Sequence, residues 1–215
     1  MCGIIGFKGT GRVMNELVEG LQRMEYRGYD SWGVAALTPR GMFIEKKVGA
    51  IGEGKLDHPP LDASLGIAHT RWATHGGVTT ANAHPHLSSD QRFAVAQNGI
   101  VENYLEFKSK LEQQGYQFKT QTDTEVIVHL IHAQLKETEQ FATAVRQAFL
   151  KLTGRNTIIV LDRETQQIVA VRNGSPLVLG HLPDGGVLLA SDTLPLAGKA
   201  ETVTYLDDQQ MVVVN

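Results

Sequence analysis

Residues 2–9 of the chain read CGIIGFKG, a short apolar run that ends in glycine. A run of about four to eight mostly apolar residues bounded by a turn residue predicts a strand buried on both faces. The run begins with Cys2, the single cysteine of this 215-residue chain. Because an unpaired cysteine is most often a small, inert core residue, the position of Cys2 alone favours a structural role.

The composition is that of a soluble globular protein, with 42% hydrophobic and 20% charged residues. A formal net charge of -3 gives no reason to expect nucleic acid or an anionic membrane as a partner. One cysteine allows no internal disulfide, and no apolar run approaches the ~18 residues of a membrane span. The apolar start is also too short for a secretory signal. We therefore expect a cytoplasmic protein.

Beyond residue 9, helical and strand patterns alternate along the chain. Apolar residues recur at helical spacing from Val13 to Met24, and Gly28 is the expected stop. Three further helices are expected within 103–115, 122–136 and 139–154. Strands are expected within 32–49, as a pair about the turn at 38–41, and within 65–71, 92–99 and 156–192, with a final hairpin at 202–214.

These connections resemble hairpins more than parallel crossovers, which favours antiparallel sheets with packed helices. Residues 1–215 contain no internal repeat, low-complexity segment or evident interdomain linker. We therefore expect a single domain.

The start of the chain also permits a reactive role for Cys2. Methionine before a small residue is a suitable substrate for aminopeptidase removal, so we expect Met1 to be removed and Cys2 to become the first residue. Its α-amine would then have an ordinary pKa of about 7.7–8.0, and its thiol one of about 8.5. Such an amine can accept and return a proton near neutral pH, so this residue can be both nucleophile and general base.

Six segments in order favour the reactive role. They are MCGIIG (1–6), EYRGYDS (25–31), GIAHTRWATHG (66–76), NAHPH (82–86), QNGIVEN (97–103) and TDTEV (122–126). Together they resemble the class II, N-terminal-nucleophile glutamine amidotransferases, and especially the glutaminase half of the isomerising glutamine–fructose-6-phosphate aminotransferases. This resemblance implies an α+β, four-layer αββα sandwich with two antiparallel sheets, the Ntn-hydrolase fold. One departure is Trp32, where a small residue is usual.

The resemblance also implies how L-glutamine is hydrolysed. Cys2 would attack the side-chain amide, while the Asn98 side chain and the Gly99 N–H would hold the oxyanion. Arg27 would help to position the terminal amine and the asparagine. The local patterns have simpler interpretations, because Asn-Gly is typical of a hairpin turn and an arginine after a helix is typical of a C-terminal cap.

The remaining implied roles concern substrate binding and fall on Arg71, Trp72, Thr74, His75 and Asp123. The planar guanidinium of Arg71 suits the α-carboxylate of glutamine, with hydrogen bonds from Thr74 and His75 in the same loop. Trp72 would help to close the site, although a packing role is equally compatible with the pattern. Asp123 would bind the α-ammonium, but TDTE also predicts a helix capping box with Thr122 as the cap.

Four histidines at positions 69, 75, 84 and 86 raise the question of a metal site. The chain has no second cysteine and no HExxH pattern, so we expect no metal and no cofactor, and interpret NAHPH as loop packing. By the same resemblance, a sugar-phosphate isomerase domain or chain would accept the ammonia. That domain is expected to be absent from residues 1–215, and the resemblance allows a homodimer in the full enzyme.

Two alternatives to a glutaminase remain open at this point. One is a non-catalytic module that senses glutamine, and the other is an N-terminal-nucleophile amidase that acts on a different substrate.

Overall fold

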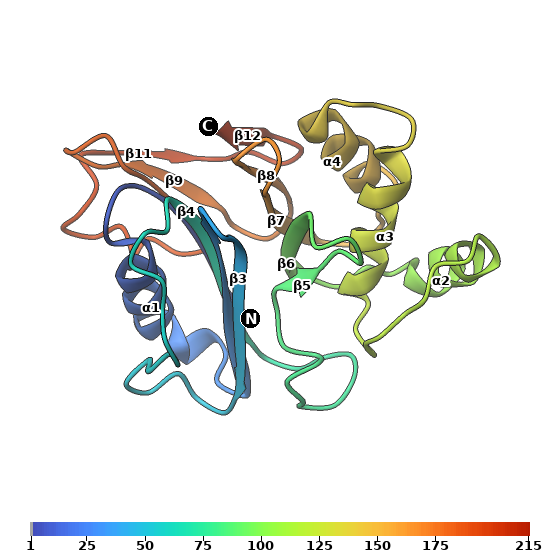
Figure 1. Ribbon diagram of the computed structural model, residues 1–215, viewed down its shortest axis with the longest axis horizontal. Helices are drawn as coiled ribbons and strands as arrows, with labels where there is room; N and C mark the ends of the chain where they lie inside the picture. The colour runs from blue at the N-terminus through green and yellow to red at the C-terminus, as the bar shows by residue number, and fades with distance from the viewer. Residues whose placement is uncertain (1) are drawn as a thin grey trace.

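Two antiparallel sheets lie face to face in the computed structural model, which describes residues 2–215 (Figure 1). The larger sheet has the strand order β11-β9-β10-β1-β4-β2-β3, and the smaller one has the order β12-β8-β7-β6-β5. Helix α1 covers the outer face of the larger sheet, while α3 and α4 cover the outer face of the smaller one. The α+β sandwich expected from the resemblance is therefore confirmed.

The elements follow the predicted segments closely. The larger sheet contains β1 (Gly3–Lys8), β2 (Ser31–Thr38), β3 (Gly41–Val48), β4 (Leu65–Arg71), β9 (Val178–His181), β10 (Val187–Ala190) and β11 (Thr202–Tyr205). The smaller sheet contains β5 (His86–Leu87), β6 (Phe93–Gly99), β7 (Asn156–Asp162), β8 (Gln167–Asn173) and β12 (Met211–Val214). The helices are α1 (Val13–Arg23), α2 (Tyr104–Gln113), α3 (Thr124–Gln134) and α4 (Phe141–Phe149), with a 3-10 turn at Glu25–Arg27.

Three hydrophobic clusters separate the four layers. Successive side chains of a strand point to opposite faces, so one strand can contribute to two clusters. Ile5 and Phe7 of β1 belong to the cluster under α1, whereas Ile4 belongs to the cluster between the sheets. On β6, Val95 faces the helices and Ala96 faces the larger sheet. Burial on both faces explains why the apolar run at the start of the chain does not alternate with polar residues.

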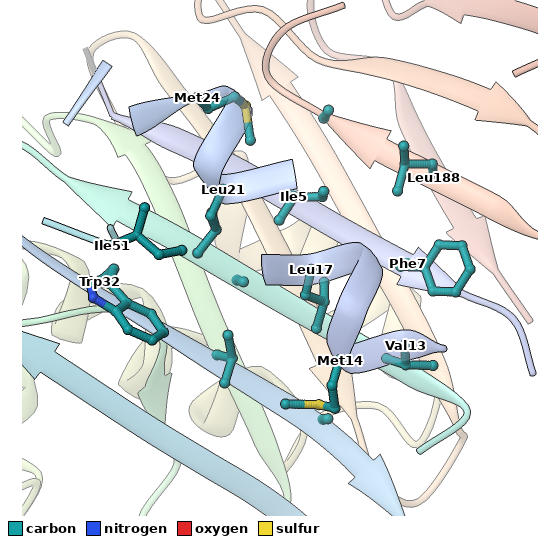
Figure 2. Packing of buried hydrophobic residues seen from close by; sticks show 14 of the residues in the cluster. Ile5, Phe7, Val13, Met14, Leu17, Leu21, Met24, Trp32, Ile51 and Leu188 are labelled. Carbon is teal, nitrogen blue, oxygen red and sulfur yellow. The ribbon is translucent and has the colours of Figure 1, made fainter. Parts of the chain in front are cut away.

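The cluster under α1 accommodates the unusual tryptophan. Figure 2 shows Leu17 and Leu21 of α1 beside Ile5, with Trp32 and Ile51 at the edge of the same group. Trp32 is only 3% exposed, and the Nζ atom of Lys47 lies 5.9 Å from its ring centre. Trp32 is therefore a core residue of this layer.

The final connection differs from the predicted hairpin. Strand β11 pairs with β9 in the larger sheet, whereas β12 pairs with β8 in the smaller one. The segment between them crosses from one sheet to the other, and Arg172 holds it through an ion pair of 2.7 Å with Asp208. Strand spacing in the sequence does not specify the partner strand, so a hairpin and a crossing segment have the same pattern. Short strand β5 was not anticipated, because NAHPH was interpreted as loop.

Helix length and polarity also bear on membrane insertion. Within residues 2–215, every helix is too short or too polar to cross a bilayer.

Candidate functional site

The pairing of β1 with β4 brings Cys2 to the end of the Arg-containing strand. Gly3 is opposite Thr70, and the Gly3 N–H donates to Oγ1 of Thr70 at 3.2 Å. One residue further out, the backbone N–H of Trp72 donates to Sγ of Cys2 at 3.2 Å. Cys2 is thus fixed directly before the start of β1, an interior strand of the larger sheet, beside the end of β4. Burial raises the pKa of its thiol, even though the Trp72 N–H favours the thiolate.

Asn98 reaches Cys2 from the other sheet. It lies two residues after Ala96 on β6, so its side chain points toward the larger sheet. Its Nδ2 donates to the carbonyl oxygen of Cys2 at 3.0 Å. The site therefore bridges the two sheets.

His69 determines which way the Asn98 amide faces. The Nε2 atom of His69 lies 3.2 Å from Oδ1 of Asn98 and 3.0 Å from the carbonyl oxygen of Gln97. Burial lowers the pKa of His69 to about 3, so the ring is neutral near pH 7. Two acceptors at Nε2 assign the single ring proton to that nitrogen. This proton directs Oδ1 of Asn98 toward His69 and the amide nitrogen toward Cys2.

Gly99 occupies a position that no other residue can adopt without strain. Its φ angle is 120°, and a Cβ atom there would lie 1.8 Å from the carbonyl oxygen of Arg155. Strand β6 ends at this residue and continues into the loop before α2 rather than into a neighbouring strand. The hairpin-turn interpretation of Asn98-Gly99 is therefore wrong.

Arg27 supplies a second side-chain donor to the Cys2 carbonyl. Its Nε donates to this oxygen at 3.2 Å, and its Nη1 forms an ion pair of 2.8 Å with Asp192. The guanidinium thus contacts the ends of two strands rather than the carbonyl groups of α1. The cap interpretation of Arg27 is wrong, and the Cys2 carbonyl receives donors from both Arg27 and Asn98.

These residues surround a cavity of about 250 Å³. Its lining residues are Cys2, Arg27, Trp72, Thr74, Asn98, Gly99, Ile100 and Ser175. The volume lies below the ~300–1,000 Å³ of sites for drug-sized ligands, which suits a molecule as small as one amino acid. Sequence reasoning did not single out Ile100 or Ser175. Ser175 lies in a segment, RNGSP, that was interpreted only as a turn.

Arg71 and His75 do not line this cavity. Arg71 ends β4 and is 3% exposed. Its Nη2 donates to the carbonyl oxygen of His75 at 2.5 Å, and its Nη1 donates to that of Gly77 at 3.2 Å. In this structure Arg71 therefore holds the loop after Trp72 by its backbone carbonyls.

Asp123 also lies outside the cavity lining, and the predicted capping box is absent. Oδ2 of Asp123 accepts the N–H of Val101 at 2.7 Å, so the carboxylate ties the start of α3 to the segment after Gly99. Asp123 is the N-terminal flanking residue of α3 and makes no side-chain cap. Thr122 instead bonds Nε2 of His86 at 3.0 Å. Tertiary partners have replaced the local cap, which makes the capping-box prediction wrong.

The histidines of HTRW and NAHPH pack against one another, His69 stacked on His84 and His86 tilted against His84. The rings of His69 and His84 are 4.3 Å apart, and those of His84 and His86 are 4.7 Å apart. Burial lowers the pKa of His86 to about 3 and that of His84 well below its ordinary value. Over residues 2–215, no group of three or more His, Cys, Asp or Glu side chains is arranged to hold a metal ion.

Comparisons with known proteins bear on the family of this chain. The sequence profile of the family described as "Glutamine amidotransferase domain" matches residues 69–197. The glutamine–fructose-6-phosphate aminotransferase [isomerizing] of Idiomarina loihiensis is 44% identical over 219 residues, which is 100% of this chain and 36% of that protein. The enzyme of the same name from Thermus thermophilus is also 44% identical, over 99% of this chain and 35% of its own length. This chain thus spans about a third of these relatives.

Two solved structures superpose on this chain over its whole length, which supports the same fold. The structure titled as the allosteric regulatory enzyme of purine biosynthesis superposes with a TM-score of 0.86 and 26% identity, over 100% of this chain and 47% of that one. The glutamine phosphoribosylpyrophosphate amidotransferase of B. subtilis superposes with a TM-score of 0.81 and 24% identity, again over 100% and 47%.

Proposed function

This chain belongs to the glutamine amidotransferase domain family, and from that premise we propose that its cavity hydrolyses L-glutamine to glutamate and ammonia through Cys2. One observation carries the proposal. Cys2 directly before β1, Asn98 on β6 and Arg27 in the 3-10 turn are separate in sequence and line one cavity of about 250 Å³.

The resting thiol needs a base before it can react. Burial raises its pKa, so the neutral thiol predominates near pH 7. We propose that Met1 is removed and that the freed α-amine of Cys2 takes the thiol proton. With an ordinary pKa of about 7.7–8.0, that amine is well matched to this task.

The sulfur then bonds to the side-chain carbonyl carbon of glutamine, and the carbonyl oxygen becomes an oxyanion. The Asn98 amide has a second N–H besides the one that binds Cys2, and the backbone N–H of Gly99 is adjacent to it. The α-ammonium protonates the leaving nitrogen, the carbon–nitrogen bond breaks, and ammonia departs. Water, deprotonated by the same amine, attacks the γ-glutamyl thioester and releases glutamate together with the thiol.

Substrate binding is proposed to involve the loop that Arg71 now holds. In this proposal Arg71 exchanges its carbonyl partners for the α-carboxylate of glutamine, with help from Thr74 and His75. Trp72 covers the cavity, and the oxygen of Asp123 that does not bind Val101 accepts the α-ammonium. Gly76, with a φ angle of 75°, supports such a rearrangement because it tolerates unusual backbone angles.

The fate of the ammonia is proposed from the relatives. They are named as aminotransferases for fructose 6-phosphate and are about three times as long as this chain. We propose that residues 1–215 form one glutaminase domain, and that a sugar-phosphate isomerase domain or chain accepts its ammonia to make glucosamine 6-phosphate. A cytoplasmic setting and a homodimeric complete enzyme are further parts of this proposal.

A glutaminase assay tests the central step. The protein is first checked by intact mass for loss of Met1, and glutamate release is then measured. Release that disappears in Cys2→Ala supports the proposal. Tight glutamine binding without turnover would instead support a sensor. If Arg71→Ala leaves the hydrolysis of amides that lack an α-carboxylate unchanged, an amidase for another substrate would be supported.

A further inference from the structure

Asp192 lies next to the reactive end of β1, although no sequence pattern singled it out. It comes two residues after Ala190, which pairs with Ile5. Between them, Ser191 exchanges two hydrogen bonds of 3.0 Å with the backbone of Ile4, one through its N–H and one through its hydroxyl oxygen. These contacts fix the position of Asp192 relative to the first residues of the chain.

Both oxygens of the Asp192 carboxylate accept hydrogen bonds. Oδ2 accepts hydrogen bonds from Nη1 of Arg27, at 2.8 Å, and from the hydroxyl of Tyr26. Oδ1 accepts the N–H of Leu194 at 3.1 Å. Burial alone would raise the pKa of Asp192, but these hydrogen bonds and the charge of Arg27 lower it. Asp192 therefore remains charged at neutral pH.

Arg27 depends on this carboxylate for its position. Its side chain is 9% exposed, and within residues 2–215 its Nη2 is buried without a hydrogen-bond partner. Two contacts hold the guanidinium, one to Asp192 and one from Nε to the Cys2 carbonyl. Without Asp192, a largely buried cation would keep only the bond to Cys2, which is an unfavourable arrangement.

We propose that Asp192 is a positioning residue for glutamine hydrolysis, because it holds Arg27 against the Cys2 carbonyl and so sets the orientation of the thiol and the α-amine. The proposal rests on the proposed glutaminase function. It assigns Asp192 a second effect as well. An unneutralised Arg27 near the α-ammonium would lower the pKa of that group and weaken it as a base at a given geometry.

A double-mutant cycle tests whether Asp192 acts through Arg27. We expect Asp192→Asn to lower kcat for glutamine by about tenfold or more while KM changes by less than about threefold. Asp192→Glu, which keeps the charge, should restore part of the loss. In an Arg27→Met background, the same Asp192→Asn change should alter kcat by less than about twofold. Effects that multiply independently in the double variant would overturn the proposal.

A matched control separates this effect from loss of a surface ion pair. Asp184, in the β9–β10 turn of the same sheet, forms a pair of 2.7 Å with Arg12 and is 54% exposed. Asp184→Asn should leave kcat unchanged, and an equal loss in both variants would contradict a specific role for Asp192. If Asp192→Asn does not fold, Tyr26→Phe removes one hydrogen bond to Asp192 from a side chain that is 61% exposed. We expect it to lower kcat about two- to fivefold, and an unchanged kcat would count against the proposal.

A second readout does not require turnover. Cys2 is the only cysteine in the chain, so alkylation by iodoacetamide, followed by intact mass, reports on this thiol alone. Asp192→Asn should change the alkylation rate at least about threefold, and the change should vanish in Arg27→Met. If the unaltered protein fails to hydrolyse glutamine, the proposed function fails, but this coupling still decides the role of Asp192. An unchanged alkylation rate would overturn that role.

Discussion

Replacing Gly99 with alanine should damage both the fold and the site, by an amount that the structure allows to be worked out. The new Cβ atom would lie 1.8 Å from the carbonyl oxygen of Arg155 and 3.1 Å from Cα of Asn156. Both neighbours are backbone, so no side chain can move aside. Real Cβ contacts are essentially absent below 3.0 Å, so the ends of β6 and β7 must separate by roughly 1.2 Å. Such overpacking costs about 1–3 kcal/mol.

Gly41 provides a matched control for the strain of the backbone itself. Its φ angle is 121°, against 120° for Gly99, and a Cβ atom there would meet nothing within 4 Å. Gly41→Ala should therefore cost only the backbone strain, about 1–3 kcal/mol. Gly99→Ala should cost about 2 kcal/mol more, which lowers the melting temperature by roughly 4–8 °C relative to the control in a domain of this size.

The assays are thermal unfolding and glutamate release by both variants. A displacement of about 1 Å beside the attacking sulfur is expected to lower kcat about 100-fold in Gly99→Ala. Gly41→Ala should retain the activity of the unaltered protein. The reasoning would be refuted if the two variants melted at the same temperature, or if Gly99→Ala kept full activity.

Three further predictions concern the site and its surroundings. Asn98→Ala should lower kcat by about 10²–10³-fold with circular dichroism unchanged, because it removes an oxyanion donor, and a loss below tenfold would argue against that role. The free energy of unfolding should fall as the pH drops below about 6.5, by up to about 1.4 kcal/mol per pH unit for each of His69 and His86. In this pH range both histidines bind a proton in the unfolded chain, whereas in the folded protein, where their pKa is about 3, they stay neutral. Urea titrations at pH 7 and 5 measure this decline, and equal midpoints would contradict it. Alkylation of Cys2 should be slower at pH 7 than that of a free thiol and should rise with pH beyond the ordinary thiol range, since burial raises its pKa; a rate that levels off below that range would contradict it.

Local patterns in the sequence were sufficient to predict most elements of the fold. The apolar run before Gly9 and the helical spacing from Val13 to Met24 both reflect burial, whose periodicity along one element can be seen in residues close in sequence. The pairing of the last strands could not be predicted in this way. Val203 on β11 lies in the alternating segment TVTY and Val213 on β12 in the apolar segment MVVV, and neither pattern specifies the sheet to which its strand belongs. Which strand each one meets is determined by contacts with residues far away in the chain.

The candidate site likewise combines residues that motifs identify with contacts that local sequence does not indicate. Motifs pointed to Cys2 and Asn98, and the structure brings them within hydrogen-bond distance. Thr122 was expected to cap its own helix, but it bonds His86 instead, a contact across 36 residues that local spacing does not indicate. Asp192 follows an ordinary strand, and its importance is visible only once Arg27 lies beside it.

The cavity is assembled where the two sheets meet, with Cys2 next to the start of β1 in one sheet and Asn98 and Gly99 at the end of β6 in the other. Neither half of the sandwich therefore supplies the whole lining of the cavity by itself. A recombination event that exchanged one sheet for that of a distant relative would preserve every motif yet disturb their alignment. Chimeras between homologues of this fold should tolerate replacement of the helices on the outer faces more readily than replacement of one of the two sheets.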